Sequence, residues 1–226
     1  AHRIDEGDAY SKRAKEELLH DYYDEEIRYV DDRVGQVYDT LNDLGILDDT
    51  VLVVTSDHGE ELGQHHQYWL HKYLYESTIQ VPLIVRYPPR LPKGKVVEGF
   101  VQQVDIVPTL LDLAGIEPRG RVLEGPGGPA AFDGRSLMPM VEKREAGRPW
   151  VFCEGGANWQ YSRTLLMPDG WKLIWHAYRT EMELYNVHDD PAEIVDLSGK
   201  ETERLAEMKG RLDGIVAEYL AGATDM

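Results

Sequence analysis

The chain has 226 residues, of which 41 are acidic and 24 basic, so its formal charge is −17. This charge excludes the basic surface that nucleic-acid binding requires. Hydrophobic residues make up 42% of the chain, which is enough to build a globular core. No apolar run approaches the ~18 to 20 residues of a membrane span, so no transmembrane segment is expected. The single cysteine, Cys153, cannot form an internal disulfide.

The first residues of the chain carry no export signal. Residues 1–8 contain neither an apolar stretch nor an initiator Met. We therefore expect the chain to be the later portion of a longer protein. No cellular compartment is indicated, because any export signal would lie before such a portion.

The first predicted element is a helix. Its apolar residues recur three and four positions apart, which predicts a stripe that faces a core. Gly45 then supplies a left-handed helix end. The charged residues 10–23 continue this helix or precede it as a turn, and Asp31-Asp32 is interpreted as part of its solvated face. The stripe consists of Ile27, Val30, Val34, Val37, Leu41 and Leu44.

Two apolar runs predict buried strands. Residues 51–54 read Val-Leu-Val-Val, which is typical of a strand covered on both faces in a parallel sheet. Residues 82–86 form the second run, and a proline-rich loop ends it. Asp105 as N-cap, Pro108 in the first turn and Gly115 at the end then predict another helix.

A stretch rich in glycine and proline, residues 117–134, predicts a loop with a domain boundary soon after it. Beyond it we expect short strands at 150–152, 164–167, 171–175 and 183–187, a hairpin turn at 168–170, and a final amphipathic helix with Leu205, Met208, Leu212, Ile215 and Leu220 on its apolar face. The expected fold class is α/β. Residues 1–140 form a partial sheet of parallel strands, and residues 141–226 form a small α+β subdomain with an antiparallel sheet.

The strongest chemical signal follows the first predicted strand, where residues 55–61 read Thr-Ser-Asp-His-Gly-Glu-Glu. Catalytic groups of open α/β sheets collect at the carboxyl ends of strands. Asp57 offers a carboxylate oxygen and His58 an imidazole nitrogen, and Gly59 lets the backbone bend so that both face one point. One interpretation is a metal site. The other is that Asp57 caps a following helix and His58 is merely exposed.

A second signal is a cluster of histidines beside a lysine. His65, His66 and His71 follow closely, and each taken alone is interpreted as a solvated loop side chain. Lys72 is different, because a cation beside a metal site would bind an anionic substrate group. Its alternative role is a salt bridge to Glu76 at i+4. Lys72, with the adjacent His71, is the catalytic candidate.

These motifs resemble the second half of a sulfatase of the alkaline phosphatase superfamily. The resemblance implies an alkaline-phosphatase-like sheet. It implies that Asp57 and His58 ligate one divalent cation, usually calcium, with Mn²⁺, Mg²⁺ or Zn²⁺ as alternatives. It also implies that Lys72 contacts the transferred sulfuryl group. The matching blocks run in the family's order over nearly the whole chain, at residues 56–60, 72, 75–76, 81–85, 104–115, 133–137, 183–187, 190–193 and 196–197.

The chain also departs from the family's pattern. It lacks the Cys/Ser-x-Pro-x-Arg motif from which sulfatases make their formylglycine nucleophile, and it lacks the Asp-Asp pair that completes the metal site. Two ligands from one dipeptide cannot complete a calcium site, which takes about 6 to 8 oxygens. We therefore expect the formylglycine and the other ligands in an N-terminal half of the same enzyme.

The main functional hypothesis is a sulfuric ester hydrolase that acts on a sulfate ester, with this chain as its C-terminal portion. A phosphoric or phosphonic ester hydrolase of the same superfamily is the first alternative. A non-catalytic half-domain that acts as a binding module is the second. Because half a sheet exposes a strand edge and an apolar face, the chain alone is expected to associate, and a homo-oligomer is one form of this association.

Overall fold

The computed structural model describes residues 9–63, 65, 68–70, 73–116, 123–125, 128–130, 133–155 and 161–224. Its helices are α1 (Ala9–Asp43), α2 (Glu76–Ile79), α3 (Ile106–Leu113), α4 (Met138–Val141) and α5 (Thr202–Thr224), with short 3-10 turns η1 (Leu47–Asp49) and η3 (Gln103–Asp105). Its strands are β1 (Leu52–Thr55), β2 (Glu61–Leu62), β3 (Tyr68–Leu70), β4 (Leu83–Arg86), β5 (Leu123–Gly125), β6 (Gly128–Ala130), β7 (Val151–Gly155), β8 (Ser162–Leu166), β9 (Trp171–His176) and β10 (Glu181–Asn186). None of the helices in these ranges combines the length and the apolarity of a membrane span.

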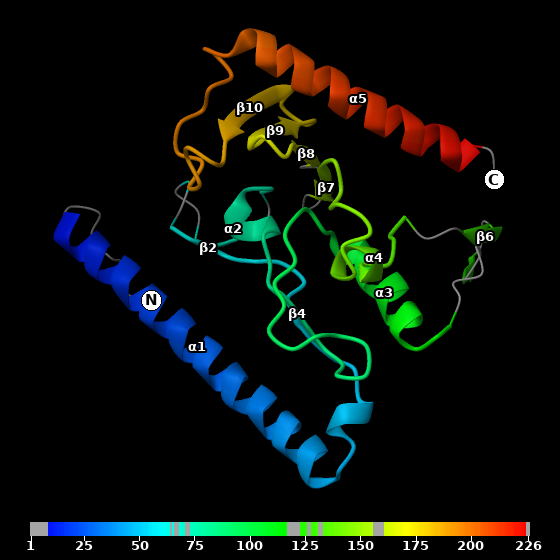
Figure 1. Cartoon of the computed structure of the whole chain (residues 1–226). Helices are drawn as coiled ribbons and strands as arrows, with labels where there is room; N and C mark the ends of the chain where they lie inside the picture. Colours follow the sequence, from blue (N-terminus) through cyan, green and yellow to red (C-terminus); the bar gives the residue numbers. More distant parts are fainter. Residues whose placement is uncertain are drawn as a thin grey trace.

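The C-terminal part is an antiparallel sheet covered by one helix, as predicted. The strands follow the spatial order β10-β9-β8-β7, and α5 lies across one face of them at the top of Figure 1. Residues 168–170 turn β8 into β9, and Gly170 adopts a φ of 86°. Between sheet and helix lies a core whose fully buried side chains are Leu165, Leu173, Leu184, Met208 and Leu212.

Strands β1 and β4 lie where the two apolar runs predict them, but their expected parallel direction is wrong. They pair antiparallel, with Thr55 opposite Leu83 and Leu52 opposite Arg86. The chain leaves β1 and enters β4 at the same end of the pair. Their expected burial is wrong as well within the described part of the chain, since no residue of either strand is fully buried and Ile84 is 61% exposed.

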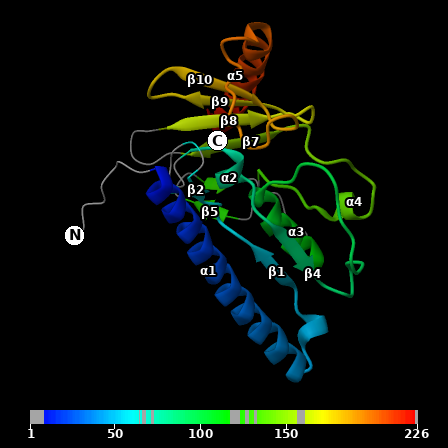
Figure 2. The same ribbon diagram turned by 90° about the vertical axis from the view of Figure 1, so that its left-hand side faces the viewer.

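The long first helix is present, but its apolar stripe is not buried. α1 spans 35 residues, and in Figures 1 and 2 it extends well away from α5 and the four-stranded sheet. Four stripe residues, Ile27, Val30, Val37 and Leu44, are each more than half exposed. The expectation that this stripe faces a core is therefore wrong within the described part of the chain. Asp31 and Asp32 are exposed, as expected.

The segment around α3 confirms some predictions and corrects others. α3 follows Asp105 and ends before Gly115, and Gly45 and Gly115 both adopt a φ of 70°, as expected for helix ends. Asp105 does not cap α3 with its side chain, because other groups bind its carboxylate. Residues 117–134 are not entirely a loop, since β5 and β6 pair antiparallel within them. Three-residue strands rich in glycine and proline are too short to show an alternating pattern.

Candidate functional site

Asp57 and His58 lie in the turn after β1. The Asp57 side chain is 86% exposed and the His58 side chain 39%, so both reach solvent at the carboxyl end of the strand. The Asp57 carboxylate accepts a hydrogen bond from the His58 backbone N–H at 3.0 Å. This bond lowers the pKa of Asp57 below its ordinary value. The next described element is β2 rather than a helix, so the interpretation of Asp57 as an N-cap is wrong.

The imidazole of His58 is held in one orientation. Its Nδ1 lies 2.8 Å from the carbonyl oxygen of Gly59, and because a carbonyl can only accept, Nδ1 must carry the hydrogen. In the neutral ring Nε2 then bears the lone pair, and it lies 3.7 Å from Oδ2 of Asp57. A metal-binding histidine typically donates its other N–H in this way. The two side chains thus fit as part of a donor set for a divalent cation.

Gly59 is required for close packing rather than for the bend that its sequence position suggests. Its φ is not positive. Its N–H donates to the carbonyl oxygen of Thr78 at 2.7 Å, and a Cβ at this position would lie 2.0 Å from the carbonyl oxygen of Ser77. Only glycine allows this approach. The turn that carries Asp57 and His58 therefore rests directly on α2.

The other side of the same turn is held by η3. Nε2 of Gln103 donates to the carbonyl oxygens of Ser56 and Asp57, at 2.7 and 2.9 Å. Gln103 opens η3, and Asp105 closes it. Two short elements distant in sequence, α2 and η3, therefore fix the backbone of the turn from two directions.

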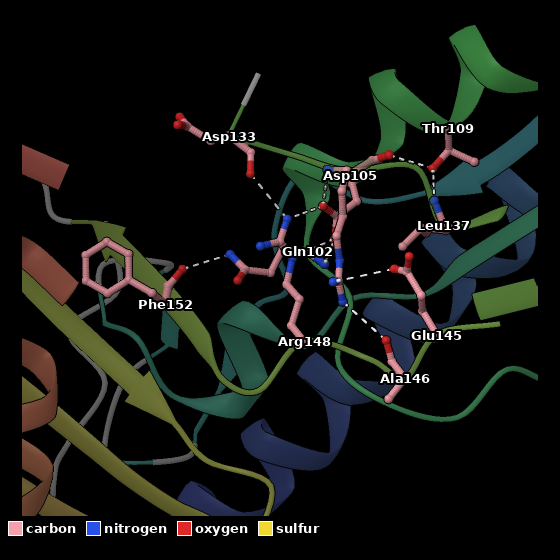
Figure 3. A network of polar contacts seen from close by, with 10 residues as sticks. Gln102, Asp105, Thr109, Asp133, Leu137, Glu145, Ala146, Arg148 and Phe152 are labelled. Carbon is pink, nitrogen blue, oxygen red and sulfur yellow. Dashed lines mark hydrogen bonds and ion pairs between the residues drawn. The ribbon is translucent and has the colours of Figure 1, made fainter. Parts of the chain in front are cut away.

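Asp105 anchors η3 through the polar network of Figure 3. Its fully buried carboxylate accepts hydrogen bonds from the backbone N–H of Gln102 and of Arg135, each at 2.9 Å. The Arg148 guanidinium donates to both carboxylate oxygens, with Nε at 3.0 Å. Burial alone would raise the pKa of Asp105, but Arg148 and the two N–H donors outweigh it and lower that pKa. The network joins η3 to the segment leading into β7.

The described residues do not include His66, His71 or Lys72. The structure therefore does not test whether the catalytic candidates Lys72 and His71 lie near this turn. Within the described ranges, no group of three or more His, Cys, Asp or Glu side chains is close enough to hold a metal ion. Asp57 and His58 are therefore a pair of donors that needs further ligands from elsewhere.

His65 is not the solvated loop side chain that its position suggests. Its ring stacks on Tyr75, with centroids 3.6 Å apart. Its Nε2 lies 2.9 Å from the carbonyl oxygen of Glu193, and its Nδ1 lies 3.6 Å from the buried carboxylate of Glu61. Burial alone would lower the pKa of His65, but these acceptors outweigh it and raise that pKa. A long-range contact that sequence reasoning could not foresee has overridden the local pattern.

A buried lysine binds the side chain of Glu193, the residue whose carbonyl oxygen contacts His65. Lys172 on β9 is fully buried, and its Nζ lies 2.9 Å from Oε1 of Glu76 and 2.7 Å from Oε1 of Glu193. The Glu76 carboxylate, considered from the sequence as a partner for Lys72, is thus bound by Lys172. Burial raises the pKa of Glu193. We name Lys172, Glu76 and Glu193 the lysine cluster.

A second buried network lies beside the lysine cluster. One oxygen of Glu183 accepts hydrogen bonds from the hydroxyls of Tyr75 and Tyr185, both at 2.8 Å. The other lies 2.9 Å from Nε2 of His176, whose Nδ1 lies 3.0 Å from Oγ of Ser162. Burial would raise the pKa of Glu183, but the donors outweigh it and lower that pKa. Because Ser162 and His176 are almost fully buried, this Ser-His-Glu array holds the fold together and offers no nucleophile to substrate.

Sequence reasoning missed the lysine cluster, although one signal was present. Lys172 alternates with Trp171, Leu173 and Trp175, which face the α5 core, so alternation alone predicts that it faces solvent. The only hint of burial is its place within an otherwise apolar run. A charged residue in a buried strand requires a charged partner. The partners themselves could not be named, because Glu76 and Glu193 lie far from Lys172 in sequence.

Family models match both parts of the chain. The model described as sulfatase matches residues 3–116, and the model described as N-sulphoglucosamine sulphohydrolase, C-terminal, matches residues 63–218. Among curated proteins, arylsulfatase K of Xenopus laevis is 28% identical over 95% of this chain. N-acetylglucosamine-6-O-sulfatase of Bacteroides thetaiotaomicron is 33% identical over 76% of it. The chain spans 41% of the first relative's length and 30% of the second's.

Solved structures agree on the fold. A protein in complex with its substrate D-glucosamine-2-N,6-O-disulfate shares 27% identity at a TM-score of 0.68, over 88% of this chain and 40% of its own. The phosphonate monoester hydrolase of Agrobacterium radiobacter has a TM-score of 0.69 at 24% identity, over 84% of this chain and 39% of its own. The fold is thus an alkaline-phosphatase-like α/β fold with a C-terminal antiparallel sheet and helix. With the matches to both family models, the chain belongs to the sulfatase family.

Proposed function

We propose that the full-length protein hydrolyses sulfuric esters and that this chain is its C-terminal portion. The observation that carries the proposal is the Asp57–His58 pair, whose carboxylate oxygen and Nε2 lie 3.7 Å apart at the end of β1 in a chain of the sulfatase family. Families of this kind use a divalent cation and a formylglycine. Calcium is the proposed ion, with Mn²⁺, Mg²⁺ and Zn²⁺ as alternatives.

Asp57 and His58 are the proposed metal ligands. A bound cation supplies positive charge that binds a sulfate oxygen. Asp57 contributes a negative charge, kept by its lowered pKa. His58 contributes a nitrogen lone pair, which the hydrogen bond of Nδ1 to Gly59 keeps on Nε2. The supports from α2 and η3 keep both donors in place, so little reorganisation is needed when the cation binds.

Lys72 and the adjacent His71 are the proposed catalytic residues. Their place shortly after the metal pair, and the resemblance to the sulfatase motif, support this role. The ammonium group of Lys72 would bind and neutralise charge on the transferred sulfuryl group. His71 would contribute a hydrogen-bond donor at the same group.

The formylglycine and the remaining metal ligands are proposed to come from an N-terminal half of the same protein. The share of its relatives that the chain spans supports this arrangement. The exposed apolar side chains of α1, and Ile84 at 61% exposure on β4, support it as well, because a packed half would cover them. We also propose a division near residue 140, with 1–140 completing the sulfatase sheet and 141–226 forming a subdomain with its own core.

The test is release of sulfate from 4-nitrophenyl sulfate by the full-length protein in calcium buffer. Asp57→Ala should lower kcat/KM by about 100-fold or more, because it removes a ligand of the ion that stabilises the transferring group. Asp31→Ala, an exposed acid on α1, is the matched control and should have no effect. Cleavage of a phenyl phosphonate ester without sulfate release would favour the phosphonic ester alternative. No turnover of either ester would favour the non-catalytic module.

A further inference from the structure

Glu193 touches two points of the candidate site region through different atoms. Its carboxylate Oε2 accepts a hydrogen bond from the backbone N–H of Glu76 at 2.6 Å. Its carbonyl oxygen accepts one from Nε2 of His65 at 2.9 Å. Glu193 is almost fully buried, and it holds a left-handed φ of 53° that non-glycine residues seldom adopt. A distant part of the chain thus fixes both His65 and the start of α2.

The contact with Glu76 replaces a missing helix cap. α2 has Tyr75 at its N-cap position, and no side chain there caps the helix. The first N–H groups of a helix have no partner within the helix, so an acceptor must come from outside. The Glu193 carboxylate supplies that acceptor, and its negative charge suits the N-terminal end. Lys172 holds this carboxylate in place at 2.7 Å.

α2 transmits the position of the lysine cluster to the proposed metal ligands. Glu76 opens α2, and Thr78, within the same short helix, accepts the N–H of Gly59 at 2.7 Å. Because a Cβ on Gly59 would lie 2.0 Å from the carbonyl oxygen of Ser77, the two backbones are in direct contact. A shift of α2 must therefore move Gly59, which directly follows His58 and holds its Nδ1.

Stability alone does not explain the lysine cluster. Replacing a buried ion pair with apolar side chains of similar volume is often neutral or stabilising. The other face of the same sheet has an apolar core, with Leu173 and Leu184 fully buried. The face toward α2 instead carries a lysine and two carboxylates. They fix the orientation of α2 relative to the sheet, because ion pairs and hydrogen bonds are more directional than apolar contacts.

We infer that Glu193, held by Lys172, is a positioning residue for the Asp57–His58 turn and sets the affinity of that turn for a divalent cation. It acts through α2 and Gly59 and does not touch substrate. The inference rests on the proposed function, because it assigns Glu193 a role in the same metal site.

The test uses the full-length protein with Glu193→Gln, Glu193→Ala and Lys172→Met. The first readout is calcium affinity by titration calorimetry, and the second is hydrogen exchange at the amides of Glu76 and Gly59. Glu193→Ala should weaken calcium binding by about 10- to 100-fold, the range seen when a residue that orients a metal ligand is removed, and should speed exchange at both amides. Lys172→Met should act in the same direction. Glu193→Gln should lie between Glu193→Ala and the wild type, since its amide oxygen can still accept from Glu76.

The control is Leu212→Ala, on α5 and across the sheet from α2, which lowers overall stability without touching the lysine cluster. It should leave calcium affinity and Gly59 exchange at wild-type values. Equal loss of calcium affinity in Glu193→Ala and Leu212→Ala, or unchanged Gly59 exchange in Glu193→Ala, would overturn the inference. Failure of the wild-type protein to release sulfate would instead contradict the proposed function. Calcium affinity and Gly59 exchange are measured without turnover, so they decide the positioning role in either case.

Discussion

The four-stranded sheet and the β1–β4 pair of the same chain differ in how they bury their apolar side chains. Between the sheet and α5 lie five fully buried residues. In the β1–β4 pair, no residue of either strand is fully buried, and Ile84 is 61% exposed. Both views place α1, β1 and β4 below the four-stranded sheet and α5 (Figures 1 and 2).

The difference shows what each region needs from the rest of the protein. The sheet with α5 has two layers that cover one another, which is sufficient for a stable core. A two-stranded pair is marginally stable by itself and depends on further layers. The proposed metal ligands lie at the end of β1, in the region that lacks those layers. The proposed C-terminal subdomain thus has a core of its own, whereas the proposed metal ligands lie in a region whose apolar side chains are not covered.

The largest expected effect comes from removing the guanidinium of Arg148, which binds Asp105 of η3 and so links η3 to the segment leading into β7. Arg148→Met leaves the carboxylate of Asp105 buried without its charged partner, which typically costs about 3 to 5 kcal/mol. Because Asp105 anchors η3, and Gln103 of η3 binds the backbone of Asp57, the Asp57 turn should also loosen. Urea unfolding measures the first effect, and calcium affinity of the full-length protein the second. A loss of stability with unchanged calcium affinity would show that η3 does not support the turn.

The next effect tests whether the C-terminal core is independent. Leu184→Ala removes a fully buried side chain between β10 and α5 and should lower the free energy of unfolding by about 2 to 5 kcal/mol. The comparison predicts that this loss appears equally in the chain alone and in the full-length protein. A much smaller loss in the chain alone would mean that its C-terminal core is not formed without the rest of the protein.

A smaller effect concerns acid. The folded pKa of Asp105 lies below its ordinary value of 3.8. Burial alone would raise this pKa, but the Arg148 guanidinium and two backbone N–H groups outweigh the effect of burial. A carboxyl with a lowered folded pKa stabilises the fold above its unfolded pKa, and this contribution is lost as pH falls through the folded one. Stability should therefore decline below about pH 4. Asp105→Asn should be less stable near neutral pH and should show a shallower decline, which thermal unfolding against pH can measure.

The sequence predicted the self-sufficient region better than the incomplete one. Strands β7 to β10 and α5 follow their apolar periodicity because these consecutive elements cover one another and bury the faces that the periodicity marks. The direction of β4 and the exposure of Ile27 depend on layers that periodicity does not describe. The proposed metal pair, Asp57 and His58, follows from a local motif, and the structure places both side chains at the end of β1 as the motif predicts. The contacts of Lys172 and Glu193 with Glu76 could not be predicted, because Glu76 lies far from both in the sequence.

The smallest expected effect in the chain alone comes from a substitution on β4. It tests most directly whether a further layer of the full-length protein covers the β1–β4 pair. Ile84→Asn replaces an exposed side chain on β4, so in the chain alone it should change the free energy of unfolding by no more than about 0.5 kcal/mol. If an N-terminal half packs on this face, the same substitution buries an amide without a partner and should cost about 1 to 3 kcal/mol in the full-length protein. Lys93→Asn, at an exposed position in the loop after β4, is the control and should be neutral in both. Equal, small effects of Ile84→Asn in both proteins would mean that this face stays in solvent. The layer that completes the β1–β4 region would then have to pack elsewhere.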